Sequence, residues 1–224
     1  MELEHLRQMA RTLGDVLPLE ILSEDDRIEI ASHMHLRKFR PDETIYHRGD
    51  PGHDAFCVFS GLVKLSLLDE HGREVIVALR KRGEFFGELA LFEESARDTS
   101  AAALDPVEAF QLARASLWQV LERNPKVRDY AFKDLADRIH EISNRYEDQV
   151  FLDVPGRLAK YLLELRRVGH DVPITQEELA AAVGSTRVTV NKLLADFERR
   201  GLVRVERRRL LVADEQGLAA EVHR

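Results

Sequence analysis

The sequence has a single cysteine and no long hydrophobic segment. Cys57 alone cannot form a disulfide within the chain, nor a cysteine-only metal or iron–sulfur site, because such sites need several thiolates. No apolar run approaches the roughly 18 residues that a membrane helix requires. The first ten residues also lack the apolar core of a secretory signal. We therefore expect a soluble cytoplasmic protein that binds neither a metal nor a membrane.

Three common catalytic motifs are also missing. The patterns HExxH, GxSxG and GxxxxGKS/T of metalloproteases, serine hydrolases and P-loop NTPases do not occur. No sequence-local pair of carboxylates and no Ser/His grouping indicates a catalytic site. We predict that the chain is not an enzyme, and a regulatory subunit of an enzyme is an alternative of a different class.

Charge is distributed unevenly along a chain whose overall net charge is −7. Residues 154–224 hold 13 Lys and Arg against 10 Asp and Glu, a net +3, which leaves −10 for residues 1–153. Eight of those basic residues and only three acidic ones fall between residues 187 and 209. An acidic body with a basic C-terminal part is typical of a modular DNA-binding protein, although a solvated basic face would look the same.

From about residue 39 to 113 the chain alternates short strand-like runs with turn signals. Ala55–Phe59, Val63–Leu68 and Val75–Leu79 are rich in β-branched and aromatic residues. Asp69–Gly72 lies between two of these runs and is expected to form a hairpin tip. Many short strands at this spacing predict a small antiparallel barrel or jelly roll.

A long helix is expected over residues 126–149, which contain no glycine or proline. Its apolar residues are spaced 3, 4, 3 and 4 apart, the stripe of a two-stranded coiled coil. They are Phe132, Leu135, Ile139, Ile142 and Tyr146. The pattern favours a homodimer, and the alternative is a helix that packs on its own barrel. Val154–Gly156 is expected to break this helix and mark a domain boundary.

The C-terminal part carries the pattern of a winged helix-turn-helix. Thr175 and Glu178 form a capping box, a short helix follows, and Gly184 ends it. Ser185 or Thr186 then caps a second helix over 187–200. Predicted strands 202–205 and 210–212 flank a basic turn, 206–209, which we interpret as the wing.

The second helix of this motif carries the candidate base-reading residues. Arginine and lysine pair with guanine, so Arg187 is the first candidate and Lys192 the second. Asparagine pairs with adenine, which makes Asn191 a further candidate. Hydroxyls and wing arginines would hold the backbone phosphates, although any exposed helix face also carries Arg and Lys. The predicted DNA-contacting residues are Thr175, Ser185, Thr186, Arg187, Val188, Thr189, Asn191, Lys192, Arg207, Arg208 and Arg209.

A candidate anion site lies in Phe86–Phe92 and the following Arg97–Ala101. Gly87 before a short helix frees backbone N–H groups that stabilise an anion. Glu88 can accept from a ribose hydroxyl, and Arg97, projecting from the next strand, can pair with a phosphate. The alternative is an ordinary turn glycine, a helix-cap glutamate and a surface arginine.

Taken together, these segments resemble the cyclic-AMP receptor protein (CRP/FNR) family over nearly the whole chain. The resemblance is carried by Phe59–Lys64, Gly72–Glu74, Phe86–Ala101, the long helix, Phe151–Ala159 and the helix-turn-helix. It implies an α+β fold with an N-terminal cyclic-nucleotide-binding-like β-roll over residues 1–123, a dimerisation helix over 124–153 and a winged helix-turn-helix over 154–224. It also implies a homodimer on inverted-repeat DNA.

The resemblance further implies cyclic AMP as effector. Gly87 and Glu88 would then bind the ribose–phosphate, Arg97 the cyclic phosphate and Ser143 the adenine. The residues implied for the ligand site are Gly87, Glu88, Leu89, Arg97, Asp98, Thr99, Ile142 and Ser143. Ligand binding would rotate the two DNA-binding domains to match successive major grooves. Asp69 and Glu70 resemble a surface that some members use to contact RNA polymerase.

Three positions depart from the family pattern. Asp98 stands where cyclic-AMP binders usually carry Ser or Thr, although Thr99 can substitute. Ile142 replaces a threonine that helps to read the adenine, and Val188 replaces a glutamate that reads cytosine. Valine can instead touch a thymine methyl group. These departures keep open an alternative in which the regulator is independent of any effector or senses something other than a nucleotide.

Overall fold

The computed structural model describes residues 10–11, 23–168, 174–206 and 209–222. Their contacts divide the chain into two compact units. The first unit contains the described residues up to Leu65 together with Ala78–Arg138, and the second contains Ser66–Val77 together with the described part of Ile139–Arg224. Within the described ranges, no helix is both long and apolar enough to cross a membrane.

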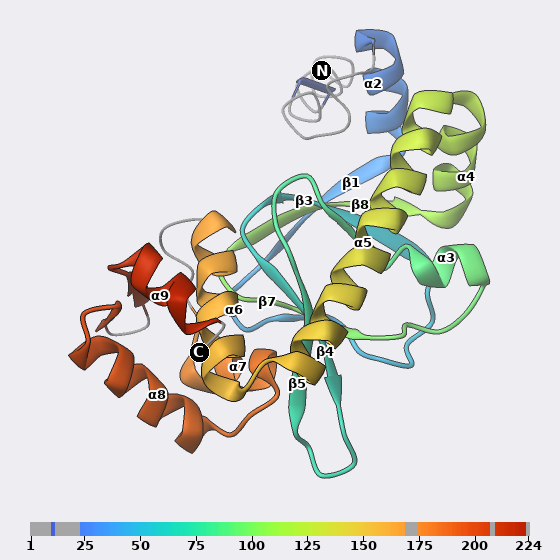
Figure 1. Cartoon of the computed structure of the whole chain (residues 1–224). Helices are drawn as coiled ribbons and strands as arrows, with labels where there is room; N and C mark the ends of the chain where they lie inside the picture. The colour runs from blue at the N-terminus through green and yellow to red at the C-terminus, as the bar shows by residue number, and fades with distance from the viewer. Residues whose placement is uncertain (1–9, 12–22, 169–173, 207–208, 223–224) are drawn as a thin grey trace. The chain divides into compact units, whose positions relative to one another are not determined.

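Eight short strands form two four-stranded sheets, which confirms the predicted antiparallel β-fold (Figure 1). The strand orders are β1-β8-β3-β6 and β2-β7-β4-β5. Pairs β1–β8, β3–β8, β3–β6 and β2–β7 are antiparallel. The strands are β1 Met34–Phe39, β2 Thr44–Tyr46, β3 Asp54–Ser60, β4 Val63–Leu68, β5 Glu74–Arg80, β6 Phe85–Phe86, β7 Ser100–Ala103 and β8 Val107–Ala113.

Four of the described helices belong wholly or partly to the first unit. They are α2 Glu24–Ser32, α3 Leu89–Glu93, α4 Arg114–Arg123 and the beginning of α5 Pro125–Phe151. Leu117 and Leu121 of α4 and Val127 of α5 pack with Phe110 of β8 in one apolar cluster. Because fully burying a side chain of this size contributes about 1.5–3 kcal/mol, this cluster holds the helices on the β1-β8-β3 sheet.

The apolar stripe on α5 does not pack on the chain itself, apart from one residue. Phe132, Ile139, Ile142 and Tyr146 are 64%, 65%, 67% and 73% exposed. Leu135 alone of the five lines a cavity in the first unit. Four large apolar side chains on one helix face therefore lack a partner within the described part of the single chain, as expected for a helix seam and not for a core helix.

The second unit contains the C-terminal helices and a two-stranded antiparallel sheet of β9 and β10. Fully buried Leu158, Leu162, Leu179, Leu194 and Phe197 come from its first three helices after α5. The elements are α6 Val154–Val168, α7 Gln176–Val183, α8 Arg187–Arg199, β9 Val203–Glu206, β10 Arg209–Val212 and α9 Glu215–Glu221. This order confirms the predicted winged helix-turn-helix.

The position of the break between α5 and α6 differs from the sequence prediction. Val154–Gly156 does not separate the helices but forms the first turn of α6, and only Leu152 and Asp153 lie between them. Pro155 is tolerated there because N–H groups of a first helical turn have no intrahelical acceptor. The Asp153 carboxylate caps the turn by accepting from the Gly156 N–H at 2.9 Å.

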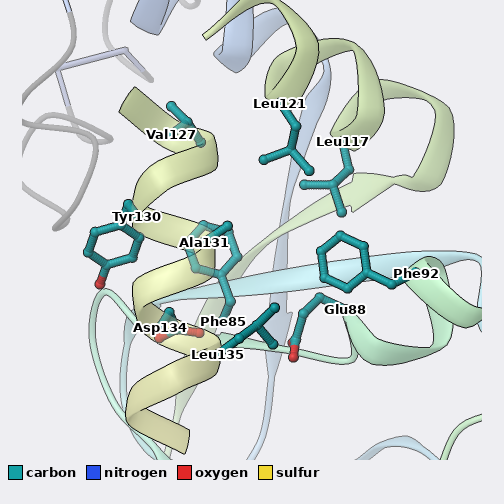
Figure 2. A pocket seen from close by; sticks show the side chains of 10 residues that line it. All are labelled: Phe85, Glu88, Phe92, Leu117, Leu121, Val127, Tyr130, Ala131, Asp134 and Leu135. Carbon is teal, nitrogen blue, oxygen red and sulfur yellow. The ribbon is translucent and has the colours of Figure 1, made fainter. Parts of the chain in front are cut away.

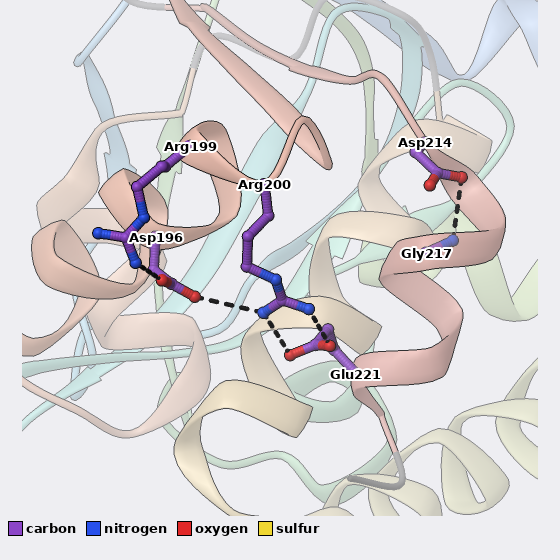
Figure 3. A network of polar contacts seen from close by, with 6 residues as sticks. All are labelled: Asp196, Arg199, Arg200, Asp214, Gly217 and Glu221. Atoms are coloured by element: carbon purple, nitrogen blue, oxygen red, sulfur yellow. Dashed lines mark hydrogen bonds and ion pairs between the residues drawn. The ribbon is translucent and has the colours of Figure 1, made fainter.

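An ionic cluster fixes the last helix of the second unit (Figure 3). Arg200 directly follows α8, and its guanidinium donates two hydrogen bonds to the Glu221 carboxylate of α9. It also pairs with Asp196, which in turn accepts from Arg199. Glu221 is buried, and burying an unpaired carboxylate costs free energy because it loses its hydration. The bidentate contact with Arg200 offsets this cost.

Candidate nucleotide site and DNA interface

Gly87 occupies a position that only glycine fits. It links β6 to α3 with φ +76°, in the left-handed region where residues with a Cβ are strained. A Cβ there would also lie 2.5 Å from Nη1 of Arg97. Glu88 follows as the N-cap of α3, and Leu89 is exposed. The structure therefore brings Gly87 and Arg97 of the predicted anion site into direct contact. We call this segment, Phe86–Ala101, the cassette.

Arg97 is a buried cation, only 5% exposed, and not a surface arginine. The expectation that it projects from a strand is wrong, because it precedes β7 in an irregular segment. Backbone bonds hold that segment: the Arg97 N–H donates to Asp50, and its carbonyl accepts from Gly49. Its Nη1 donates to the Gly87 carbonyl at 2.6 Å, whereas its buried Nε has no hydrogen-bond partner among the described residues.

Glu88 is buried as well, 6% exposed, and its carboxylate pairs with Arg138 of α5. Arg138 also donates to the Phe85 carbonyl at 2.5 Å and pairs with Asp134 at 2.7 Å. The second oxygen of Glu88, Oε2, is buried without a partner in the described structure. Sequence reasoning missed Arg138, because nothing local in the sequence indicates that it meets Glu88, a residue 50 positions earlier.

The cassette thus leaves one buried donor and one buried acceptor unsatisfied by the residues that the structure describes. They are Nε of Arg97 and Oε2 of Glu88, and each such orphan costs about 1–3 kcal/mol unless a partner reaches it. A ligand with an anionic oxygen and a neighbouring hydroxyl supplies both partners. A ribose bearing a phosphate has this combination, so the residues present fit the nucleotide that the family resemblance implies.

Asp98 and Thr99 occupy different environments although they are neighbours in sequence. Asp98 is exposed, whereas Thr99 is buried. The Thr99 hydroxyl lies 3.4 Å from Oδ1 of Asp98, and it also forms a hydrogen bond with the phenol of Tyr46. The Asp98 carboxylate is therefore hydrated, which weakens its repulsion of an anion bound at Arg97.

Ile142 and Ser143, the other predicted ligand residues, lie on α5 within the second unit. Both are exposed, and the Ser143 hydroxyl donates to the Ile139 carbonyl at 2.9 Å. Their contact with a nucleotide stays a prediction.

An apolar cavity of about 40 Å³ adjoins Glu88 in the first unit (Figure 2). Phe92 of α3, Leu117 and Leu121 of α4 and Leu135 of α5 contribute to its lining. Asp134 also lines the cavity, so the ionic cluster of Glu88, Arg138 and Asp134 borders a largely apolar space.

The helix-turn-helix presents its second helix, α8, with an exposed N-terminal end. Gly184 forms the turn with φ +63°, and the Thr186 hydroxyl accepts from the Thr189 N–H to cap α8. Arg187, Val188 and Lys192 are exposed, and Ser185 and Thr189 are partly exposed. Thr175 is exposed too, but its hydroxyl is engaged with Glu178 in the predicted capping box. The N-terminal end of α8 therefore offers several side chains to a DNA groove.

Asn191 is partly buried, and its Oδ1 is buried without a hydrogen-bond partner among the described residues, so its contact with DNA stays a prediction. The wing turn is narrower than predicted, because Glu206 and Arg209 already pair across β9 and β10. Arg207, Arg208 and the Arg209 side chain lie outside the described residues.

The end of α5 is tied to the helix-turn-helix within the second unit. Arg157 of α6 donates to the carbonyls of Leu152 at 2.7 Å and Val183 at 2.9 Å. A Cβ on Gly184 would lie 2.8 Å from Nε2 of Gln149, which places the α5 side chain directly against the turn. Sequence reasoning missed these contacts, which join the end of α5 to the turn before α8.

Comparison with known proteins matches both parts of the chain. A cyclic nucleotide-binding domain model matches residues 36–124, and a Crp-like helix-turn-helix domain model matches residues 156–221. A CRP-like cAMP-activated global transcriptional regulator of Mycobacterium tuberculosis is 36% identical over 192 residues, covering 81% of this chain and 85% of that protein. The cAMP-activated global transcriptional regulator Vfr of Pseudomonas aeruginosa is 30% identical, covering 82% and 92%.

A solved structure of similar sequence agrees with these matches. It is a CRP/FNR-family transcriptional regulator from Thermus thermophilus, which aligns with a TM-score of 0.71 at 29% identity. The alignment covers 85% of this chain and 99% of that one.

Proposed function

Because this chain belongs to the CRP/FNR family of transcription regulators, we propose that it acts as a homodimer gated by cyclic AMP. Its cyclic nucleotide-binding domain would sense the effector, and its helix-turn-helix domain would bind an inverted-repeat DNA site. The observation that carries the proposal is the buried pair of unsatisfied groups beside Gly87, Nε of Arg97 and Oε2 of Glu88.

The charges of the cassette support a cyclic nucleotide over a phosphomonoester. One buried cation, Arg97, faces the ligand, because Arg138 is engaged by Glu88 and Asp134. A cyclic phosphodiester carries one negative charge and matches that single cation. A second phosphate charge would lie near the buried carboxylate of Glu88, and like charges in a partly desolvated site repel strongly. The relatives from M. tuberculosis and P. aeruginosa are named as cAMP-activated.

Gating is tested by DNA affinity with and without effector. Fluorescence anisotropy on a labelled inverted repeat should show much tighter binding at saturating cyclic AMP than with 5′-AMP or no nucleotide. Equal affinity in all three conditions would favour an effector-independent regulator. That alternative has its own support, since Nη1 of Arg97 and Oε1 of Glu88 already have partners within the protein.

DNA reading would centre on the exposed end of α8. Arg187 would pair with a guanine and Val188 would contact a thymine methyl group, while Lys192 serves as a second reader. Hydroxyls at Ser185, Thr186 and Thr189 would position the phosphates together with the wing arginines.

Replacing Glu177 with glutamine should tighten DNA binding. Its carboxylate lies 3.8 Å from Nη1 of Arg187, and both side chains are exposed. A surface ion pair of this kind contributes roughly 0.2–1 kcal/mol, so freeing Arg187 should raise affinity by up to about fivefold. Glu122→Gln, an exposed residue of α4, is the charge-matched control, and anisotropy at several salt concentrations is the measurement. Weaker binding by Glu177→Gln would contradict the competition between Glu177 and DNA for Arg187.

We also propose that the β4–β5 hairpin tip contacts RNA polymerase, with Glu70 as its key residue. Asp69 is structural, because it accepts from the N–H groups of His71 and Arg73 and from the Arg73 guanidinium, which lowers its pKa. The Glu70 side chain is 87% exposed. Glu70→Lys should therefore reduce transcript yield from an activated promoter while DNA affinity stays the same. An unchanged yield in a reconstituted transcription assay would refute the contact.

A further inference from the structure

The aromatic ring of Tyr46 lies directly against the guanidinium of Arg97. The central carbon of the guanidinium is 4.3 Å from the ring centroid of Tyr46. Tyr46, the last residue of β2, is buried, and a Cβ on Gly87 would lie only 3.3 Å from its Cε1. Tyr46, Gly87 and Arg97 therefore form one compact contact within the first unit.

Other aromatic rings hold Tyr46 in this position. Its ring centroid is 6.1 Å from that of Phe86 and 6.2 Å from that of Phe56. Phe56 and Phe86 are stacked on each other at 5.1 Å, and Phe86 is completely buried. Because Phe86 directly precedes Gly87, the cluster fixes the cassette backbone and the Tyr46 ring together.

The contact decides which part of Arg97 is free to meet a ligand. The central carbon of the guanidinium lies over the Tyr46 ring, and the Gly87 carbonyl accepts from Nη1. Nε stays buried without a hydrogen-bond partner in the described part of the chain. A guanidinium that rests on a π-surface and is anchored at one nitrogen has little rotational freedom, so its other N–H donors, Nε–H among them, have a defined direction.

We propose that Tyr46 is a positioning residue of the nucleotide site, which holds Arg97 through a cation–π contact so that its free edge meets the ligand phosphate. The proposal rests on the proposed function for the ligand, but the contact itself does not. Burial keeps the Tyr46 phenol neutral by raising its pKa. The ring, and not the hydroxyl, is the part that acts on Arg97.

The affinity experiment separates the ring's electrostatics from its bulk. Calorimetric titration with cyclic AMP should give a similar affinity for wild type and Tyr46→Phe, and about tenfold weaker binding for Tyr46→Leu. Pentafluorophenylalanine at position 46 keeps the ring's shape but reverses the charge of its face, and it should weaken binding to a similar extent. Phe59→Leu, which removes a ring that contacts a different cation, Arg82 at 4.8 Å, should bind as wild type does. Wild-type affinity in the fluorinated protein would overturn the proposal.

A double-mutant cycle tests whether Tyr46 acts through Arg97. Once Arg97 is replaced by glutamine there is no cation to hold, so adding Tyr46→Leu should weaken binding by less than about twofold. A further loss as large as that seen in the wild-type background would show that Tyr46 acts independently, which contradicts the proposal.

The last measurement needs no nucleotide. In ¹⁵N-edited NMR spectra the Arg97 Nε–H signal, assigned by its loss in Arg97→Gln, should be shifted by the ring current and exchange slowly. Both properties should be lost in the Tyr46→Leu protein, and in the fluorinated protein the signal should move because the reversed charge of the ring face displaces the guanidinium. If wild type binds no cyclic nucleotide, the proposed effector is wrong while this spectrum still decides the Tyr46–Arg97 contact. An unmoved signal in both variants would refute it.

Discussion

Replacing Ile142 with arginine should convert the proposed homodimer into a monomer and lower its affinity for an inverted-repeat DNA site by roughly 100- to 10,000-fold. Ile142 lies in the middle of the exposed stripe of α5 and is 67% exposed in the single chain. In a helix seam its burial would contribute about 1.5–3 kcal/mol per chain. The substitution also brings two like charges together at the symmetry axis. A monomer still binds one half-site, but its DNA-binding domain is no longer linked to a second one that binds the other half-site.

Sedimentation equilibrium and anisotropy on full-site and half-site duplexes measure these two effects. Asn144→Arg is the matched control, because it adds the same charge at an exposed α5 position outside the stripe. We expect the control to remain dimeric and to bind the full site as wild type does. A dimeric Ile142→Arg protein at micromolar concentration would show that the exposed stripe is not the dimer interface.

Replacing Arg97 with glutamine should weaken nucleotide binding and shift the response to higher concentrations of cyclic AMP. Arg97 offers the buried donor without a partner among the described residues, and a hydrogen bond to a charged group contributes about 1.5–3 kcal/mol. Its loss corresponds to a roughly 10- to 150-fold weaker affinity for the nucleotide. The variant should need correspondingly more cyclic AMP to bind its DNA site.

Calorimetry gives the nucleotide affinity, and anisotropy at increasing cyclic AMP gives the activation curve. Arg37→Gln is the control, since Arg37 is an exposed residue of β1 whose side chain donates to Gln111. Circular dichroism melts should establish that both variants fold. If Arg97→Gln binds cyclic AMP as tightly as wild type, the phosphate does not bind at Arg97 and the cassette has another role.

Local rules in the sequence were sufficient to predict several parts of the molecule. The capping box of Thr175 and Glu178 and the left-handed Gly184 involve only neighbouring residues, so their sequence signals are complete. The stripe on α5 depends only on helical periodicity, and its exposure agrees with the predicted seam. Gly87 and Arg97 were candidates for an anion site from the residues themselves, and the family resemblance assigned both to the nucleotide, whereas their direct contact was not predicted.

Tertiary structure alone decided which of these side chains meet one another. The Glu88–Arg138 pair joins residues 50 positions apart, and the Tyr46–Arg97 contact joins strand β2 to the segment before β7. No local signal indicated that Arg138 meets Glu88 or that the Oδ1 of Asn191 is buried, because both result from packing between elements. The periodicity of a sequence indicates on which face of its helix or strand a residue lies. Whether a buried donor or acceptor finds a partner depends on elements brought together only when the chain folds.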